Sequence, residues 1–162
     1  MVIRQASIKD IPAIHKLAHD TWWPTYTGVI SDEQIRSMLG NMYSKDALKK
    51  QMDEGMTFLI VERDEKPVAF AAYSLIEPNN LVYKLEKLYV LPSEQGKGTG
   101  KALISEVMRI AKEIGGKILE LNVNRNNPAY HFYSKLGFKV YKKVDIPYQQ
   151  FVLNDYIMRQ SL

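Results

Sequence analysis

A glycine-rich turn between a strand-like run and a helix constrains this chain more than any other feature. The apolar and aromatic run Leu81–Leu91 is followed by Gln95–Gly100, which holds three glycines. The next segment repeats apolar residues at helical spacing until it meets Gly115. Such a turn directs several backbone N–H groups and the positive end of the helix at one spot. The sequence therefore predicts an anion seat of the kind that pyrophosphates occupy, with Lys97 and Lys101 beside it.

The turn by itself does not identify the ligand. The P-loop spacing GxxxxGK[ST] is absent, and the Rossmann spacing GxGxxG fails because Lys101, Ala102 and Leu103 follow Gly100. A tight turn with a purely structural role is the alternative to a phosphate site at this stage.

The remaining patterns predict a mixed α/β chain. Serines at 7, 31 and 44 precede helical repeats, the first with Asp10 in a capping-box arrangement, and Trp22–Ile30 reads as an aromatic loop. A short helix is expected between Asn127-Pro128 and Gly137. Consecutive strand-like runs argue against a purely parallel sheet. The expected strands are Val2–Gln5, Thr57–Glu62, Val68–Ile76, Leu81–Leu91, Lys117–Asn124, Phe138–Val144 and Phe151–Arg159.

Composition narrows the class of protein. A length of 162 residues predicts one domain spanning 1–162, and no apolar run reaches the roughly 18 residues of a membrane helix. We expect a cytoplasmic protein that does not bind membranes. Because there is no cysteine, thiolate metal sites and thiol nucleophiles are excluded. The net charge of +4 is far below that of a dedicated nucleic-acid binder, so no nucleic-acid partner is expected.

A second motif lies at Asn126–Phe138, with the sequence NNPAYHFYSKLGF. Ala129, Phe132, Tyr133 and Leu136 share one face of the predicted helix. Tyr133 either packs in the core or keeps its hydroxyl at a cleft, where it would serve as a hydrogen-bond donor and acid. His15 and His19 have the i, i+4 spacing of a metal pair, but no third ligand is evident, and we expect no metal.

Together the two motifs resemble the GNAT superfamily of N-acetyltransferases. The turn matches that superfamily's Q/R-x-x-G-x-G/A signature, and the second stretch matches N-x-x-A-x-x-F-Y-x-K-x-G-F. The firm resemblance covers Leu81 to Phe138, including the strand before the turn. It implies a central seven-stranded, mostly antiparallel sheet with a splayed parallel pair formed by Leu81–Leu91 and Lys117–Asn124, flanked by helices.

The resemblance also implies acetyl-CoA as co-substrate, in the gap between the two parallel strands. The pyrophosphate would lie on amides of the turn, and pantetheine would pair with the backbone near Leu88, Tyr89 and Val90. Asn126 matches an asparagine that contacts pantetheine in the family. Arg125 and Lys135 would meet the nucleotide phosphates or, alternatively, remain solvated. The implied positions in the turn are Gln95, Gly96, Lys97, Gly98, Thr99, Gly100 and Lys101.

Acetyl transfer requires the acceptor ammonium to lose a proton and the departing thiolate to gain one. Tyr133 matches the family's general acid. Glu86, which strand alternation places on one face with Leu88 and Val90, is the candidate base, because apolar neighbours raise the pKa of a carboxylate. A salt-bridged surface role is the alternative for Glu86. Without cysteine, direct transfer in a ternary complex is favoured over an acyl-enzyme.

We expect residues on both sides of the cleft to form the acceptor site. Trp22 and Trp23 either line this site or, alternatively, anchor their loop to the core. We expect a small-molecule amine, held by some of Trp22, Tyr26, Asn122, Asn124 and Tyr148. The aromatic loop, the YSKLGF stretch and Asp155–Met158 resemble the bacterial polyamine acetyltransferase branch. The acidic residues available to a polycation are Asp32, Glu33, Glu77, Glu86 and Asp145.

Several alternatives stay open at this point. Another small amine, or a protein or peptide amine, would satisfy the same motifs, as would a CoA-binding regulatory module without turnover. The family resemblance is also compatible with a homodimer, although no interface is visible in the sequence.

Overall fold

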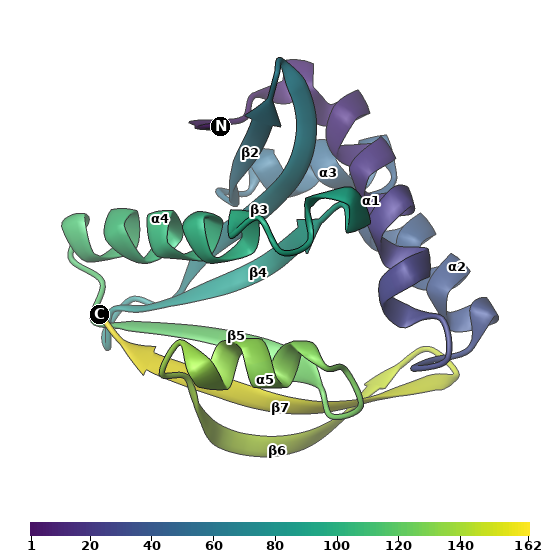
Figure 1. The fold of residues 1–162 in the computed structure, drawn as a ribbon. Coiled ribbons are helices and arrows are strands. Elements are labelled where there is room, and N and C mark those ends of the chain that lie inside the picture. Colours follow the sequence, from purple (N-terminus) through teal and green to yellow (C-terminus); the bar gives the residue numbers. More distant parts are fainter.

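A seven-stranded sheet with strand order β1-β2-β3-β4-β5-β7-β6 forms the centre of the computed structural model, which describes all 162 residues (Figure 1). Neighbouring strands run antiparallel except for the pair β4 and β5. The mixed, mostly antiparallel sheet predicted from the sequence is therefore confirmed. The strands are β1 (Val2–Gln5), β2 (Thr57–Arg63), β3 (Lys66–Glu77), β4 (Val82–Val90), β5 (Ile118–Asn124), β6 (Lys139–Tyr148) and β7 (Phe151–Ser161).

Helices cover both faces of the sheet, because successive residues of the central strands point in opposite directions. In β2, Phe58 and Ile60 pack into one cluster with α1 (Ile11–Tyr26), α2 (Asp32–Tyr43) and α3 (Lys45–Asp53). Leu59 and Val61 pack into the other cluster, with α4 (Thr99–Glu113) and α5 (Ala129–Lys135). Two short 3-10 helices, Ile8–Asp10 and Pro92–Glu94, complete the elements. None of the helices is long and apolar enough to cross a membrane.

The predicted helix starts are confirmed by their capping hydrogen bonds. Ser31 accepts from the backbone of Gln34, and Ser44 accepts from that of Ala47. Ser7 and Asp10 form a reciprocal capping box, which here begins the first 3-10 helix ahead of α1. Hydroxyl side chains thus satisfy N–H groups that a helix leaves without an internal partner.

The prediction of a loop over Trp22–Ile30 is wrong for residues 22–26, because α1 continues to Tyr26 with Pro24 inside it, and only residues 27–30 form a turn. A proline lacks the N–H that would bond one turn back, which disfavours helix. Tertiary packing outweighs this cost: Trp22 is 3% exposed, and its ring centroid lies 4.4 Å from that of Tyr26 and 5.3 Å from that of Tyr43. The helix end is therefore fixed by aromatic contacts that are distant in sequence.

The two parallel strands separate after a short stretch of pairing. Residues 82–85 of β4 pair with residues 118–121 of β5, and beyond Leu85 the pairing stops (Figure 1). From there β4 pairs only with β3, and β5 only with β7. Each strand consequently has a row of backbone N–H and C=O groups facing the gap.

A β-bulge lies where the strands separate. In the pairing with β3, Leu85 lies opposite Tyr73 and Lys87 opposite Ala72, so Glu86 is the inserted residue. Beyond the bulge, Leu88 packs towards α4, whereas Lys87 lies over the Tyr43 ring on the side of α1 and α2. Glu86 bonds to Ser74 on that same side. The expectation that Glu86 shares a face with Leu88 and Val90 is therefore wrong.

Candidate active site

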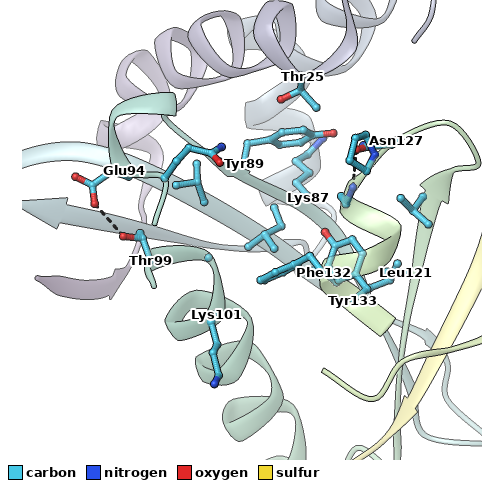
Figure 2. Close-up of a pocket in the computed structure, with 18 of the residues that line it drawn as sticks. Thr25, Lys87, Tyr89, Glu94, Thr99, Lys101, Leu121, Asn127, Phe132 and Tyr133 are labelled. Carbon is cyan, nitrogen blue, oxygen red and sulfur yellow. Dashed lines mark hydrogen bonds between the residues drawn. The ribbon is translucent and has the colours of Figure 1, made fainter. Parts of the chain in front are cut away.

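A cavity of about 710 Å³ opens where β4 and β5 diverge, between the end of α1, the glycine-rich turn and α5 (Figure 2). Twenty-five residues line it, and they include most of the positions predicted from the two motifs. Those predicted positions are Tyr26, Glu86, Leu88, Tyr89, Val90, Gln95, Gly96, Gly98, Thr99, Gly100, Lys101, Asn122 and Tyr133.

The glycine-rich turn has the backbone that an anion seat requires. Gly96 and Gly98 have φ values of 79° and 76°, a left-handed conformation that side chains with a Cβ disfavour. Gly98 caps α4, whose 15 residues begin at Thr99, so the positive end of a long helix meets the cavity. Lys97 does not line the cavity, and its Nζ lies 3.7 Å from a carboxylate oxygen of Glu94.

Glu94 is a buried acidic residue beneath this turn that the sequence analysis missed. It is 4% exposed and accepts hydrogen bonds from Arg63 Nε at 2.9 Å and from the Thr99 hydroxyl at 2.8 Å (Figure 2). Burial raises the pKa of Glu94, but the bonds from Thr99 and Arg63 together outweigh it and lower the pKa below its ordinary value. The ionised carboxylate thus ties the start of α4 to β2. The amides of Gln95 and Lys97 donate to the carbonyl oxygens of Pro92 and Glu94, which leaves those of Gly96 and residues 98–101 for a ligand.

The edge of β4 facing the gap offers the second part of a binding site. Leu88, Tyr89 and Val90 line the cavity, and β5 does not pair with this part of β4. An extended ligand with amide groups, such as pantetheine, can pair with such an edge as an added strand would. An anion seat lies at one end of the same cavity, so these residues fit coenzyme A.

Tyr133 comes from α5 and is 8% exposed. Its hydroxyl points into the cavity, on the side where Lys87 and Tyr89 lie (Figure 2). Burial raises the pKa of Tyr133 well above its ordinary value, so the phenol keeps its proton at neutral pH. The geometry is that of a proton donor at a cleft, while the ring packs against Phe132 and Phe138.

Glu86 lines the cavity in polar surroundings rather than the apolar ones expected. Its carboxylate accepts a hydrogen bond of 2.9 Å from the Ser74 hydroxyl, and Lys84 Nζ lies 3.9 Å away. These contacts hold the carboxylate at the wall of the cavity, within the bulge.

Lys87 is a second cavity residue that the sequence analysis missed. It is 4% exposed, it makes no ion pair, and its Nζ lies 4.0 Å from the centroid of the Tyr43 ring. Burial lowers the pKa of Lys87 to about 8, against the opposing effect of Glu86. Strand alternation alone would place Lys87 on the other face, so only the bulge reveals its position.

Two of the residues expected to hold the acceptor line the cavity. The Tyr26 hydroxyl lies 2.9 Å from that of Tyr89, and burial raises the pKa of Tyr26 to about 12. Asn122 donates from Nδ2 to Asp155 at 3.3 Å, and its Oδ1 is buried without a hydrogen-bond partner. Trp22 is packed in the core behind this wall and does not line the cavity.

Four other predicted positions lie outside the cavity lining. The side chain of Asn124 accepts from the backbone of Asn126 in a local turn, and the Tyr148 hydroxyl accepts from Asn41 at 3.1 Å. Asn126 and Lys135 are exposed. The neighbouring Asn127 lines the cavity instead, while its Oδ1 accepts from the backbone of Ala129.

Two charged or basic groups singled out in the sequence have structural partners. Arg125 donates to the backbone of Val144 and pairs with Asp145 at 2.6 Å. The Nδ1 atoms of His15 and His19 lie within hydrogen-bond distance of the carbonyl oxygens of Tyr43 and His15.

Comparison with known proteins decides the family. The profile described as the Acetyltransferase (GNAT) family matches residues 16–138. This chain belongs to the GNAT family. A spermidine N(1)-acetyltransferase from Thermoplasma acidophilum is 33% identical to it over 144 residues, which cover 85% of this chain and 88% of the relative.

Solved structures show the same GNAT fold. The PaiA N-acetyltransferase from Thermoplasma acidophilum, crystallised with coenzyme A, aligns with a TM-score of 0.85 at 30% identity, covering 99% of this chain and 98% of the other. The ribosomal-protein-S18-alanine N-acetyltransferase from Escherichia coli aligns with a TM-score of 0.75 at 19% identity, covering 99% and 92%, and shows the fold alone. This GNAT chain is therefore an acyltransferase of the acetyl-CoA-dependent type.

We expect Lys87→Met to stabilise the protein at neutral pH. The pKa of Lys87 falls from 10.5 to about 8 on folding, so the charged form is disfavoured in the folded state at every pH below about 8. Removing that charge should raise the free energy of unfolding by about 1–3 kcal/mol, after the lost contact with Tyr43 is allowed for. The gain should shrink as pH rises from 8 to 10.5, where unfolded lysine also loses its proton.

Urea unfolding at a series of pH values measures this difference. Lys112→Met, which removes an exposed charge on α4, is the matched control and should change stability little at any pH. A gain that does not depend on pH, or a loss at neutral pH, would contradict the buried and unpaired state of the Lys87 ammonium.

Proposed function

We propose that this chain transfers the acetyl group of acetyl-CoA to the primary amine of a small molecule by direct attack in a ternary complex. The observation that carries the proposal is a single cavity at the β4–β5 gap with an anion seat at one end and Tyr133 and Glu86 in its walls. The PaiA relative was crystallised with coenzyme A, which supports the same use of this gap.

In this proposal the diphosphate of acetyl-CoA binds the backbone amides of Gly96 and of residues 98–101 at the start of α4, because those of Gln95 and Lys97 already donate to backbone carbonyls. Lys101 adds positive charge there, and pantetheine pairs with the free edge of β4 near Leu88 and Val90. A backbone N–H of the same strand polarises the thioester carbonyl and stabilises the oxyanion that forms on attack.

Two side chains then move the protons. Glu86 accepts a proton from the acceptor ammonium, directly or through water, and the neutral amine attacks the thioester carbon. The C–S bond breaks, Tyr133 donates its proton to the departing thiolate, and the resulting phenolate regains a proton from the acetylated nitrogen. Because the chain has no cysteine, no thiol of the protein can carry the acetyl group between the two substrates.

The name of one relative supports a small amine as the acceptor. The Thermoplasma relative is named for spermidine, which makes a polyamine one acceptor class to test, and other small primary amines stand beside it. Retention of both Tyr133 and Glu86 in the cavity favours turnover over a CoA-binding module without activity.

Incubation with acetyl-CoA and a panel of amines, followed by measurement of free thiol, tests the function. We expect thiol release that depends on a small primary amine and gives the matching N-acetyl product by mass spectrometry. Binding of CoA without thiol release for any amine would contradict the proposal and favour a regulatory module. Release only with peptides would assign the acceptor to proteins instead.

Tyr133→Phe should lower kcat by about 10²-fold if the hydroxyl protonates the thiolate. CoA affinity should be retained, because the ring still fills its place against Phe132 and Phe138. Tyr130→Phe is the matched control on α5, since Tyr130 packs against Tyr156 and does not line the cavity. Equal turnover in the two variants would remove Tyr133 as the acid.

Glu86→Gln should lower kcat and flatten the part of the pH–rate profile that rises with pH, because a neutral amide cannot accept the ammonium proton. Ser74→Ala keeps the carboxylate and removes only its hydrogen bond, so the rising limb should persist. If Glu86→Gln has a rising limb like that of the unmodified enzyme, another group or a water chain is the base.

A further inference from the structure

The bulge in β4 places two opposite charges side by side in the cavity without pairing them. Glu86 and Lys87 are consecutive, both line the cavity, and both lie on the side of α1 and α2. The Glu86 carboxylate is held by Ser74 and Lys84, whereas the Lys87 ammonium rests on Tyr43. A ligand can therefore meet a negative and a positive group from adjacent residues.

The Lys87 ammonium has no carboxylate within ion-pair distance, and Glu86 acts on it only through the longer-range field. A lysine that is only 4% exposed is almost always paired, because removing an ammonium from water is costly. The Tyr43 ring contributes only a weak attraction in comparison. Since burial lowers the pKa of Lys87 no further than about 8, most of these side chains remain charged at neutral pH. An anionic group of a ligand bound in the cavity would form the ion pair that Lys87 does not form within the protein.

Across the gap from Lys87, the side-chain oxygen of Asn122 lacks a hydrogen-bond donor. Its Oδ1 is buried and accepts no hydrogen bond, and Asn122 lines the same cavity. The identity of this atom is fixed by its partner, because the other amide atom lies 3.3 Å from the Asp155 carboxylate and must be the donor nitrogen. The wall of the cavity thus needs one donor at Asn122 and one anion at Lys87.

We propose that the acceptor is a primary amine that also carries a carboxylate. Its ammonium donates to Glu86 and to Oδ1 of Asn122, and its carboxylate pairs with Lys87. Lys87 then determines specificity, because it favours an acceptor with a negative charge at the end opposite its amine. This inference rests on the proposed function and narrows its acceptor class.

The distribution of acidic residues disfavours a polycation in the same position. Of the five acidic residues that the sequence offered to one, only Glu86 lines the cavity. Glu94 also lines it but is paired with Arg63, and Asp155, which accepts from Asn122, lies outside the lining. Glu77 is paired with Arg159, and Asp145 with Arg125. A second ammonium on the acceptor would instead meet Lys87, and like charges in a buried site repel one another.

Equilibrium binding measurements compare acceptors of equal length that differ only in the charge at the end opposite the amine. Protein saturated with CoA, which cannot turn over, is titrated by calorimetry with ω-amino acids from glycine to 6-aminohexanoate. The n-alkylamines and diamines of equal length serve as the neutral and cationic counterparts. At neutral pH we expect the best ω-amino acid to bind about tenfold or more tightly than its alkylamine, as befits one charge-assisted pair, and the diamine to bind most weakly.

Lys87→Met should abolish the advantage of the ω-amino acid while the affinity for the alkylamine stays the same or improves. A merely structural lysine would change all three ligands alike. Lys112→Met removes an equal charge from the exposed side of α4 and should leave the order of affinities intact.

Either of two results would overturn the inference: tighter binding of diamines than of ω-amino acids to the unmodified protein, or an advantage of ω-amino acids that survives in Lys87→Met. The thiol-release assay distinguishes failure of the proposed function. If the preference for ω-amino acids depends on Lys87 but no acetyl transfer occurs, the binding inference stands and the proposed reaction is wrong.

Discussion

Separation of β4 from β5 after Leu85 is the constraint on which the rest of the molecule depends. Two parallel strands that stop pairing leave backbone groups without partners, which is costly unless water or a ligand satisfies them. The same separation opens the cavity and brings the N-terminus of α4, the bulge of β4 and the hydroxyl of Tyr133 to one place. Binding and chemistry thus share one structural cause.

Three charged groups around the cavity differ in the contacts that stabilise them. The charge of Glu94 is balanced by Arg63, and its carboxylate also accepts a hydrogen bond from Thr99 at the start of α4. Glu86 is held by Ser74 and Lys84 in the wall of the cavity, where the proposed reaction needs a proton acceptor. Lys87 has no carboxylate within ion-pair distance, and its ammonium is stabilised only by the Tyr43 ring and by the more distant charge of Glu86. Stability is sacrificed at Lys87, which is typical of residues kept for binding or catalysis.

Local signals allowed much of the site to be predicted. Glycines at 96 and 98 do adopt left-handed backbone, and Tyr133 does line the cavity, because turn geometry and helix periodicity act over a few residues. Predictions failed where contacts distant in sequence decide the outcome. Packing of Trp22 against Tyr43 extends α1 through Pro24, and a hydrogen bond from Asn41 holds the Tyr148 hydroxyl outside the cavity lining. Asn124 is a different case, because its side chain is used in a local turn with the backbone of Asn126.

The amino-acid sequence by itself was enough to predict the family, the mixed sheet, the glycine-rich turn before α4 and the candidate acid, since each depends on short patterns of residue type. Only the tertiary structure decided which other side chains line the cavity. One inserted residue in β4, defined by pairing with β3, reverses the alternation beyond it and brings Lys87 to the wall of the cavity. The register of a strand depends on its neighbour, and no periodicity within β4 encodes that relation.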